Sequence, residues 1–300
     1  MYQIFDNSKK YSGNNSTLKR LSNILNLKIT NKIQNKIIGI HAYKFGNLVI
    51  DKNIEYILII GGTDINEDIY DNHKLLIIKK SLQQSKYIIC FNNFLKDHVI
   101  SINPSLSNKI KIIPQSIIFE NTLLNYDFRS KLSKLNYSYD NYQKIFVMVG
   151  NLRKIKNPFY LENFFNNNCK YLLVLIGDNL ENYEINNTKN FLYLGPIENN
   201  LLPSIYQQVD GLINTSVSEG MSTSILEAMY YKCPVFAFNN EGNRSIINDG
   251  VNGFLFNNVN EFENKIKKYN KEIIINAFNI IKNYCKSNFE KNEYIKLIKK

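Results

Sequence analysis

The stretch GLINTSVSEGMSTSILEAM, residues 211–229, joins a strand to a helix through a polar loop. Gly211–Ile213 is a short apolar run, Glu219-Gly220 favours a turn, and the residues that follow have helical spacing. Met221–Ser224 is predicted to be the first helical turn, with Glu227 about one and a half turns into the helix. A strand that leads through a loop into a helix is the repeating unit of α/β folds.

Short apolar runs separated by potentially helical stretches recur along the chain. Such runs are typical of parallel strands that are covered on both faces of their sheet. They predict an α/β protein with two doubly wound domains. The runs are Lys36–Ile40, Tyr56–Ile60, Tyr87–Cys90, Lys111–Ile113, Ile145–Val149, Tyr171–Ile176, Phe191–Leu194, Gly211–Ile213 and Pro234–Phe238.

The pattern lapses between Phe119 and Gln143, where polar residues predominate. This lapse predicts a linker region at residues 121–143, between an N-terminal domain at 1–120 and a C-terminal domain at 144–284. The Lys-rich residues after Phe262 predict helices.

Composition narrows the class of protein. The net charge of +11 is spread along the chain, without a compact basic cluster, so no nucleic-acid partner is expected. A phosphorylated substrate, or peripheral contact with an acidic membrane surface, fits this charge better. No apolar run approaches the roughly 20 residues of a membrane helix, and Met1–Lys10 lacks a secretory signal, which predicts a cytoplasmic protein.

Four polar loops follow predicted strands. In open parallel sheets, ligands bind beyond the carboxyl ends of the strands. The loops are therefore expected on one side of their sheets, where they would line a cleft shared by the two halves. They contain Gly61–Asp64, Gly150–Arg153, Gly177-Asp178 and Glu219-Gly220.

The two glutamates of the opening stretch suit a ligand with phosphate and hydroxyl groups. A helix start offers unpaired N–H groups and a positive dipole end to phosphate, and carboxylates accept hydrogen bonds from sugar hydroxyls. A sugar diphosphonucleoside carries both kinds of group. Alternatively, Ser224 and Glu227 form a capping box, and Glu219-Gly220 is an ordinary turn.

Arg153 and Lys156 lie three residues apart after the run that ends at Val149. If a helix starts near Pro158, both cations can reach one diphosphate and neutralise a departing nucleoside diphosphate. The alternative is a solvated basic loop, and Lys154 is expected to face water.

Three further positions are candidates for the opposite wall. Asp64 is predicted to hold a sugar hydroxyl or to receive a proton from the acceptor, unless it caps a helix or forms an Asx-turn. His41 ends an apolar run and is predicted to contact substrate, although a lone His is often structural. Ser12–Asn15, with Gly13 and Asn14, is predicted to be a small-residue loop near a phosphate or acceptor.

Several motifs are missing from the sequence. It contains no G-x-G-x-x-G after a strand, no Walker A motif and no Asp-x-Asp pair, and its four cysteines form no C-x-x-C pair. We therefore expect neither a bound cofactor nor a metal, with a nucleotide sugar as co-substrate.

Ordered motifs from Val149 to Phe256 resemble the retaining glycosyltransferases of family 4. These motifs are VGNLRKIKNP, LLVLIGD, FLYLGPI, SEGMSTSILEAM, CPVFA and NDGVNGFLF. Near the N-terminus, SGNNSTLKR, IHAYKFG and IIGGTDINED are similar to a narrower branch, the glycosyltransferase 1 domain-containing proteins, and more distantly to the selenosugar synthases.

The resemblance implies the GT-B fold, in which two Rossmann-like domains face a cleft and the last helix, here residues 285–300, completes the N-terminal domain. It implies that Gly150, Arg153 and Lys156 bind the donor diphosphate, that Glu227 binds the ribose and that Glu219 binds the transferred sugar. Backbone amides of Gly220, Met221 and Ser222 would contact sugar or phosphate.

Two departures from the family pattern affect specificity. Thr63 and Asp64 occupy the region where many members place a histidine beside the sugar. Ser222 replaces the usual proline, and the glutamate common near Ser245 is absent.

The implied activity is transfer of a hexosyl group from a UDP-, GDP- or ADP-sugar to an unidentified acceptor. The resemblance implies retention of configuration without a metal, through a front-face reaction in which the leaving phosphate helps to deprotonate the acceptor. The alternative is a catalytically inactive protein that binds nucleotide sugars with the same fold. Nothing in the sequence indicates an oligomeric state.

Overall fold

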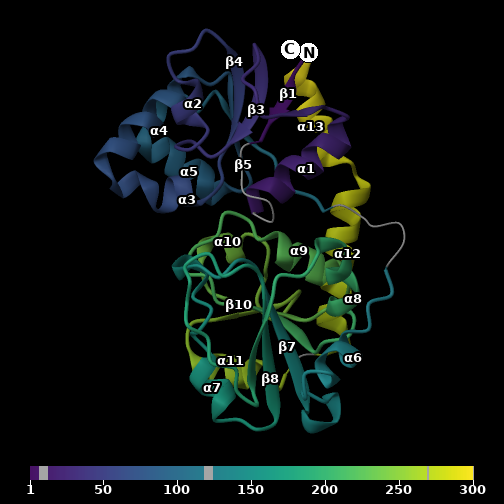
Figure 1. Ribbon diagram of the computed structural model, residues 1–300. Helices are drawn as coiled ribbons and strands as arrows, with labels where there is room; N and C mark the ends of the chain where they lie inside the picture. Colours follow the sequence, from purple (N-terminus) through teal and green to yellow (C-terminus); the bar gives the residue numbers. More distant parts are fainter. Residues whose placement is uncertain (7–12, 118–123, 269, 300) are drawn as a thin grey trace. The chain divides into compact units, whose positions relative to one another are not determined.

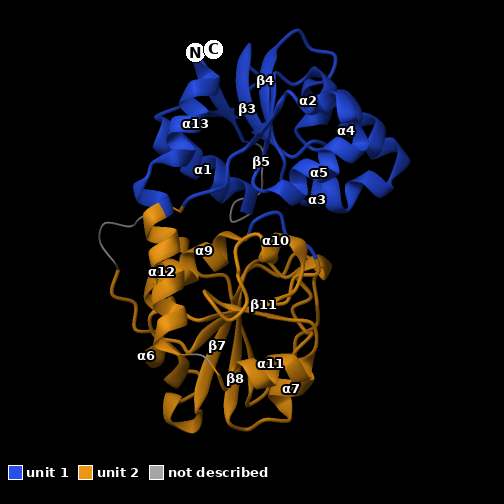
Figure 2. Ribbon diagram, turned by 180° about the vertical axis from the view of Figure 1, so that it is seen from behind, with its two compact units in different colours: residues 1–116, 218–221, 284–300 blue, residues 117–217, 222–283 orange. Residues whose placement is uncertain are grey.

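The computed structural model describes residues 1–6, 13–117, 124–268 and 270–299. Backbone contacts divide the chain into two compact units, which are coloured separately in Figure 2. Unit 1 contains Met1–Ser116, Ser218–Met221 and Tyr284–Lys300, and unit 2 contains Ile117–Val217 and Ser222–Asn283. Unit 1 is therefore assembled from segments that are far apart in the sequence.

Unit 1 contains a parallel sheet whose described strands have the order β2-β1-β3-β4-β5-β6. Its central strands are rich in buried isoleucine and leucine, which suits strands covered on both faces. The strands are β1 (Gln3–Phe5), β2 (Ile29–Thr30), β3 (Lys36–Ile40), β4 (Glu55–Ile59), β5 (Tyr87–Cys90) and β6 (Ile110–Ile112).

Helices cover the unit 1 sheet on both sides (Figure 1). Polar side chains cap several of them: Asp71 accepts a hydrogen bond from the Lys74 N–H at the start of α4, and Asn92 accepts one from the Leu95 N–H at the start of α5. The helices are α1 (Gly13–Leu25), α2 (Gly46–Val49), α3 (Thr63–Asn66), η1 (Asp68–Tyr70), α4 (Asn72–Gln84), α5 (Asn93–Ile102), η2 (Pro104–Leu106) and α13 (Phe289–Ile298).

Unit 2 contains a second parallel sheet, with the order β12-β11-β10-β7-β8-β9 for its described strands. Phe146 and Met148 of β7 pack in an aromatic cluster with Phe165, Phe236 and Phe262. The strands are β7 (Lys144–Val149), β8 (Tyr171–Ile176), β9 (Phe191–Gly195), β10 (Gly211–Asn214), β11 (Val235–Phe238) and β12 (Phe254–Phe256).

Helices of unit 2 precede β7, lie between most pairs of successive strands and follow β12 (Figure 1). They are α6 (Phe128–Ser133), η3 (Tyr139–Asn141), η4 (Lys154–Lys156), α7 (Glu162–Asn166), η5 (Asn199–Leu201), α8 (Leu202–Tyr206), α9 (Thr223–Tyr230), α10 (Glu241–Arg244), α11 (Val259–Lys265) and α12 (Lys271–Lys286). The last residues of α12, from Tyr284 onward, belong to unit 1.

The prediction of two doubly wound parallel sheets is confirmed. Strands β1, β2 and β12 are absent from the predicted runs because each has only two or three residues. Residues 124–143 differ from the expected linker, since Phe128 and Leu132 of α6 are fully buried in unit 2. Gly13 and Asn14 were predicted to lie in a loop, but they form the first turn of α1, while Ser12 lies outside the described residues.

Candidate functional site

A small hollow lies in unit 2 beyond the carboxyl ends of β7 and β10. It encloses about 270 Å³, including space open to solvent. Its polar lining comes from the loop after β7 and from the end of β10, where parallel α/β sheets bind ligands. The polar or glycine residues of the lining are Gly150, Asn151, Lys156, Asn214, Thr215 and Ser216.

A buried hydroxyl fixes the turn that carries Lys156. Thr215 Oγ1 donates to the carbonyls of Lys156 and Asn157, at 3.0 and 2.8 Å, and Thr215 is only 1% exposed. The Val217 N–H donates to the Ile155 carbonyl at 2.9 Å. The 3₁₀ turn η4 is thus attached to the segment after β10, which places Lys156 on the hollow.

Backbone contact between two glycines closes one side of this region. Gly150 follows β7 and Gly177 follows β8, and both have positive φ angles, 149° and 151°. A Cβ atom on Gly177 would lie 2.1 Å from the Gly150 carbonyl oxygen. Only glycine permits this approach.

Arg153 does not appear among the residues that line the hollow. It is half-buried and precedes η4, and Asn157 has left-handed backbone angles. The helix expected near Pro158 begins only at Glu162, because this left-handed residue turns the chain first. The structure therefore places Gly150 and Lys156 on the hollow, and Lys154 is exposed.

Neutral polar side chains gather at the end of β10 and the start of α9. Asn214 Oδ1 accepts from the Ser216 N–H at 3.1 Å and from Asn243 Nδ2 at 3.3 Å, and Asn214 Nδ2 donates to Ser222 Oγ at 3.4 Å. Ser222 Oγ also lies 3.0 Å from Ser224 Oγ. These contacts fix the loop on both sides of the Glu219 segment.

Helix α9 begins later than predicted. It runs from Thr223, with Ser222 at the N-cap, because the backbone of Ser222 is still extended, with ψ at 116°. Glu227 is the fifth helical residue, two positions beyond the one that closes a capping box, so that alternative is wrong. Glu227 is half-buried and its Oε2 accepts from the Tyr206 hydroxyl at 3.3 Å. Burial raises the pKa of Tyr206, which keeps this donor protonated.

The loop Ser218–Met221, which carries Glu219, belongs to unit 1. Side-chain amides hold three of its residues: Asn66 contacts Ser218, Asn92 contacts the Gly220 carbonyl and Gln115 contacts the Met221 carbonyl. Sequence reasoning missed all three amides, because their partners are more than 100 residues away.

Asp64 is fully buried in unit 1, at the start of α3. Its Oδ2 accepts from the backbone N–H groups of Ala42 and Gly61, at 2.7 and 3.1 Å, and its Oδ1 accepts from the Gly62 N–H at 2.8 Å. The carboxylate therefore ties the loop after β3 to the loop after β4. Gly62, and not Asp64, is the N-cap of α3.

His41 adjoins this carboxylate-bound loop and is 2% exposed. Its φ angle of 88° is unusual for a residue with a Cβ atom. Nδ1 accepts from the Lys44 N–H at 3.2 Å, and Nε2 lies 3.2 Å from Thr63 Oγ1, which indicates a neutral ring protonated on Nε2. Burial lowers the pKa of His41, in agreement with this neutral form.

Asn14 also reaches this edge of the unit 1 sheet. Its Oδ1 would lie 3.6 Å from a Cβ atom built on Gly61. The structure therefore brings Asn14, His41, Thr63 and Asp64 to the carboxyl ends of β3 and β4. Gly13 begins the same helix.

Neither a metal site nor a membrane span is evident in the described part of the chain. No group of three or more His, Cys, Asp or Glu side chains in residues 1–6, 13–117, 124–268 and 270–299 has an arrangement that holds a metal ion. Within the same ranges, every helix is too short or too polar to cross a bilayer.

Solved structures define the class of fold. The chain superimposes on HepE from Anabaena, solved with UDP-glucose, with a TM-score of 0.75, 14% identity and coverage of 97% of this chain and 96% of that one. Sucrose-phosphate synthase from Thermosynechococcus elongatus gives a TM-score of 0.67 at 15% identity, over 88% and 73% of the two chains. With its two parallel sheets, the protein has the two-domain α/β GT-B fold.

Sequence comparison finds a matching domain model and a relative over most of the chain. Residues 136–283 match the family described as glycosyl transferases group 1. The chain is 28% identical over 281 residues to glycosyltransferase 1 domain-containing protein 1 from Xenopus tropicalis, covering 86% of this chain and 80% of the relative. These matches support a GT-B glycosyltransferase.

A second relative is a bacterial enzyme. The chain is 28% identical over 229 residues to UDP-Gal:alpha-D-GlcNAc-diphosphoundecaprenol alpha-1,3-galactosyltransferase from Escherichia coli. This alignment covers 65% of the chain and 57% of the relative's length.

Proposed function

We propose that this protein is a retaining, metal-independent glycosyltransferase of family 4, which moves a hexosyl group from a nucleotide sugar to an acceptor. The observation that carries the proposal is the hollow in unit 2, where Gly150 and Lys156 meet the polar end of β10. The group 1 domain match over residues 136–283 supports the same assignment.

The chemistry of this hollow suits a diphosphate. None of its described lining residues is acidic, and Lys156 supplies a positive charge. Gly150 has no side chain, so its backbone can approach a ligand closely. Cations and amide dipoles that are fixed before reaction stabilise charge developing on a leaving diphosphate.

The remaining donor contacts are assigned from the sequence. Arg153 is proposed to add a second cation at the diphosphate, and Glu227 is proposed to accept hydrogen bonds from the ribose hydroxyls. Glu219 is proposed to contact the transferred sugar, with the backbone amides of Gly220, Met221 and Ser222. The leaving phosphate is proposed to help deprotonate the acceptor, so that no protein nucleophile is needed.

The unit 1 residues are proposed to have different roles. Asp64 is proposed to position the loops after β3 and β4, because its carboxylate already accepts hydrogen bonds from three backbone N–H groups. Thr63 and the Gly13-Asn14 turn, supported by the buried neutral ring of His41, are proposed to form the polar surface that meets the acceptor or a phosphate. The acceptor is not assigned to a chemical class.

The donor base is proposed to be uracil. HepE was solved with UDP-glucose, and the name of the E. coli relative specifies UDP-Gal. Titration calorimetry with UDP, GDP and ADP tests this choice, and UDP is expected to bind most tightly.

Two neighbouring lysines provide a matched test of the hollow. Lys156→Ala is expected to weaken UDP binding about tenfold, the loss typical of one charge-assisted contact. Lys154→Ala, in the same turn but exposed, should leave UDP binding unchanged. Equal affinities for the two variants would refute the assigned phosphate site. UDP-glucose that is bound by the wild type but never consumed, across a panel of acceptors, would instead identify an inactive nucleotide-sugar-binding protein.

The cysteines support the proposal of a cytoplasmic location. Cys90, Cys169, Cys233 and Cys285 are all free thiols. Unpaired cysteines are typical of a reducing compartment. Cell fractionation of the tagged protein tests this location.

A further inference from the structure

We propose that three side-chain amides of unit 1, those of Asn66, Asn92 and Gln115, form a cradle that positions the Ser218–Met221 loop and thereby the Glu219 carboxylate. The inference rests on the proposed function, in which Glu219 contacts the transferred sugar. The three amides are positioning residues, because they act on the loop and not on the ligand.

The amide cradle holds the loop on both sides of Glu219. Asn66 Nδ2 donates to Ser218 Oγ at 2.5 Å. Asn92 Nδ2 donates to the Gly220 carbonyl at 2.7 Å, and Gln115 Nε2 donates to the Met221 carbonyl at 2.6 Å. The residue before Glu219 and the two after it are therefore each bound by a different element of unit 1.

The orientation of two of these amides is fixed by their other contacts. Gln115 Oε1 accepts from Thr17 Oγ1 at 3.0 Å and from the Arg20 guanidinium at 2.9 Å. Arginine has no acceptor, so the oxygen of Gln115 must face it and the nitrogen must face Met221. Asn92 Oδ1 likewise accepts the Leu95 N–H at the α5 cap, which leaves its nitrogen for Gly220.

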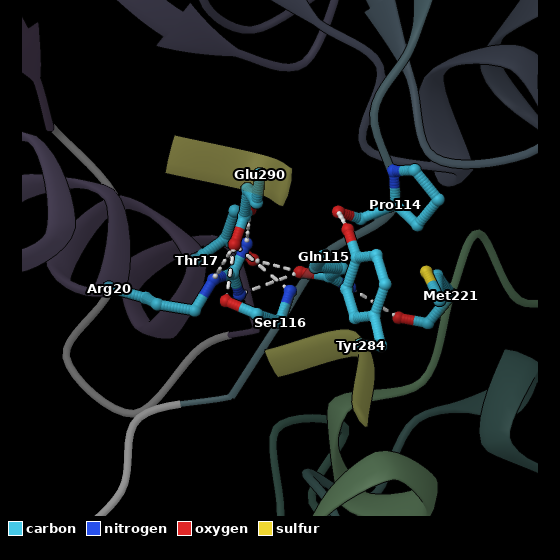
Figure 3. A network of polar contacts seen from close by, with 8 residues as sticks. All are labelled: Thr17, Arg20, Pro114, Gln115, Ser116, Met221, Tyr284 and Glu290. Atoms are coloured by element: carbon cyan, nitrogen blue, oxygen red, sulfur yellow. Dashed lines mark hydrogen bonds and ion pairs between the residues drawn. The ribbon is translucent and has the colours of Figure 1, made fainter. Parts of the chain in front are cut away.

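A buried ion pair between Arg20 and Glu290 supports Gln115 (Figure 3). Arg20 binds Glu290 of α13 through two nitrogens, at 3.2 and 2.7 Å, and both side chains are at most 3% exposed. Glu290 Oε2 also accepts from the N–H and the hydroxyl of Ser116, at 2.9 and 2.5 Å. Gln115 is thus held by α1, by α13 through Arg20, and by its own neighbour in the chain.

Backbone contact completes the cradle. A Cβ atom on Gly220 would lie 3.1 Å from the Gly61 carbonyl oxygen, and one on Gly62 would lie 3.0 Å from the Gly220 nitrogen. The amides of Asn92 and Gln115 hold the Gly220 and Met221 carbonyls, and the backbone is still extended at Ser222, one residue before α9 begins. The loop is therefore fixed both by side-chain hydrogen bonds and by close glycine contact.

Asn92→Asp separates the two roles of this side chain, which are to cap α5 and to hold the Gly220 carbonyl. Aspartate keeps an oxygen that caps α5 but has no nitrogen for Gly220. Asn92→Ser does the same without adding charge. Asn103→Asp is the matched control, because Asn103 caps η2 through the Ser105 N–H and lies outside the cradle.

Two measurements test the cradle. In hydrogen-exchange mass spectrometry, peptides that contain residues 218–221 should exchange about tenfold faster in both Asn92 variants than in wild type or Asn103→Asp, since one buried hydrogen bond is lost. In transfer assays with UDP-sugar, the same variants should lose kcat by at least about tenfold, because small displacements of a contact group are costly. The affinity for UDP and the melting temperature should match those of Asn103→Asp.

The outcomes separate the two proposals. Faster exchange of the loop in a protein that shows no transfer activity would support the cradle and refute the proposed function. Wild-type exchange and kcat in both Asn92 variants of an active enzyme would overturn the cradle and leave the proposed function standing. A loss of kcat that is accompanied by a lower melting temperature than that of Asn103→Asp would also overturn the cradle. That result would show that Asn92 only stabilises the fold.

Discussion

The two units bury different kinds of polar side chain. Among the described residues, unit 1 buries Arg20, His41, Asp64 and Glu290, whereas the buried polar side chains of unit 2 are amides and hydroxyls such as Asn214, Thr215 and Asn243. Buried charges require close partners, and in unit 1 each of the two carboxylates accepts at least three hydrogen bonds. Two units built on sheets of the same class thus contain different kinds of buried polar group.

This difference matches the roles proposed for the two units, which are diphosphate binding in unit 2 and the positioning of loops in unit 1. In unit 2, no acidic residue lines the described hollow, so nothing there repels a diphosphate. In unit 1, the buried charges bind backbone and other side chains and so fix loops. Four experiments follow, in order of decreasing expected effect.

The largest effect is expected from the backbone contact in unit 2. Gly177→Ala should destabilise unit 2 by about 5 kcal/mol, because a Cβ atom would overlap the Gly150 carbonyl at 2.1 Å and the φ angle is 151°. Gly150→Ala has nearly the same φ angle, 149°, but open space around its Cβ, and should cost about 1–3 kcal/mol. Urea denaturation measures both, and equal losses would show that the overlap relaxes without cost.

Removal of one buried charge should have the next largest effect. Arg20→Ala leaves Glu290 buried without its cation and is expected to cost unit 1 about 3–5 kcal/mol. In unit 2, Lys267→Ala breaks an exposed pair with Glu263 and should cost less than about 0.5 kcal/mol. Denaturation followed by hydrogen exchange in α1 and α13 gives the comparison. Similar losses in the two variants would contradict the role assigned to burial.

Unit 1 should also depend on pH through His41. Because burial lowers the pKa of His41, the unfolded chain takes up a proton below about pH 6.5 that the folded unit resists. Stability should therefore fall as the pH drops from 6.5, by up to about 1.4 kcal/mol per pH unit, until the lowered folded pKa is reached. His41→Asn tolerates the positive φ angle and should flatten this dependence, while the exposed His73→Asn should not. An unchanged slope in His41→Asn would rule out this origin.

The smallest effect concerns a single hydroxyl in each unit. Thr215→Val removes the donor that holds the Lys156 turn and should cost about 1–2 kcal/mol, with a measurable loss of UDP affinity by calorimetry. Thr17→Val removes the donor to Gln115 in unit 1 and should cost about 1 kcal/mol without changing UDP affinity. If both variants bind UDP as the wild type does, the Thr215 hydroxyl is not needed to place Lys156.

Local patterns in the sequence were sufficient to predict most of the strands. Buried runs such as β3, β5 and β8 were predicted with the bounds found in the structure, because their apolar character is continuous. Edge strands such as β2 have only two residues, and pairing with a neighbour defines them more than composition does.

The site was predictable where side chains follow a strand in sequence and unpredictable where they depend on distant partners. Gly150, Lys156 and Asp64 were singled out because each lies in a loop that follows a strand, and two of them, Gly150 and Lys156, line the hollow. The late start of α9 was missed because the residues before it are held by distant side chains. Asn92 and Gln115 bind the carbonyls of Gly220 and Met221, which are 128 and 106 residues away in the sequence. The capping role of Gly62 at α3 and the three contacts of Asp64 likewise depend on loops brought together by the sheet.

The Arg20–Glu290 pair also bears on how the protein is made. Its two members are separated by 270 residues, which a ribosome needs roughly 15 to 50 s to translate. Throughout that interval the nascent chain contains the guanidinium of Arg20 without its carboxylate, and α1 lacks the helix on which it packs. The segment that contains α1 is therefore synthesised long before it can reach its native structure, and chaperones have access to it throughout that interval.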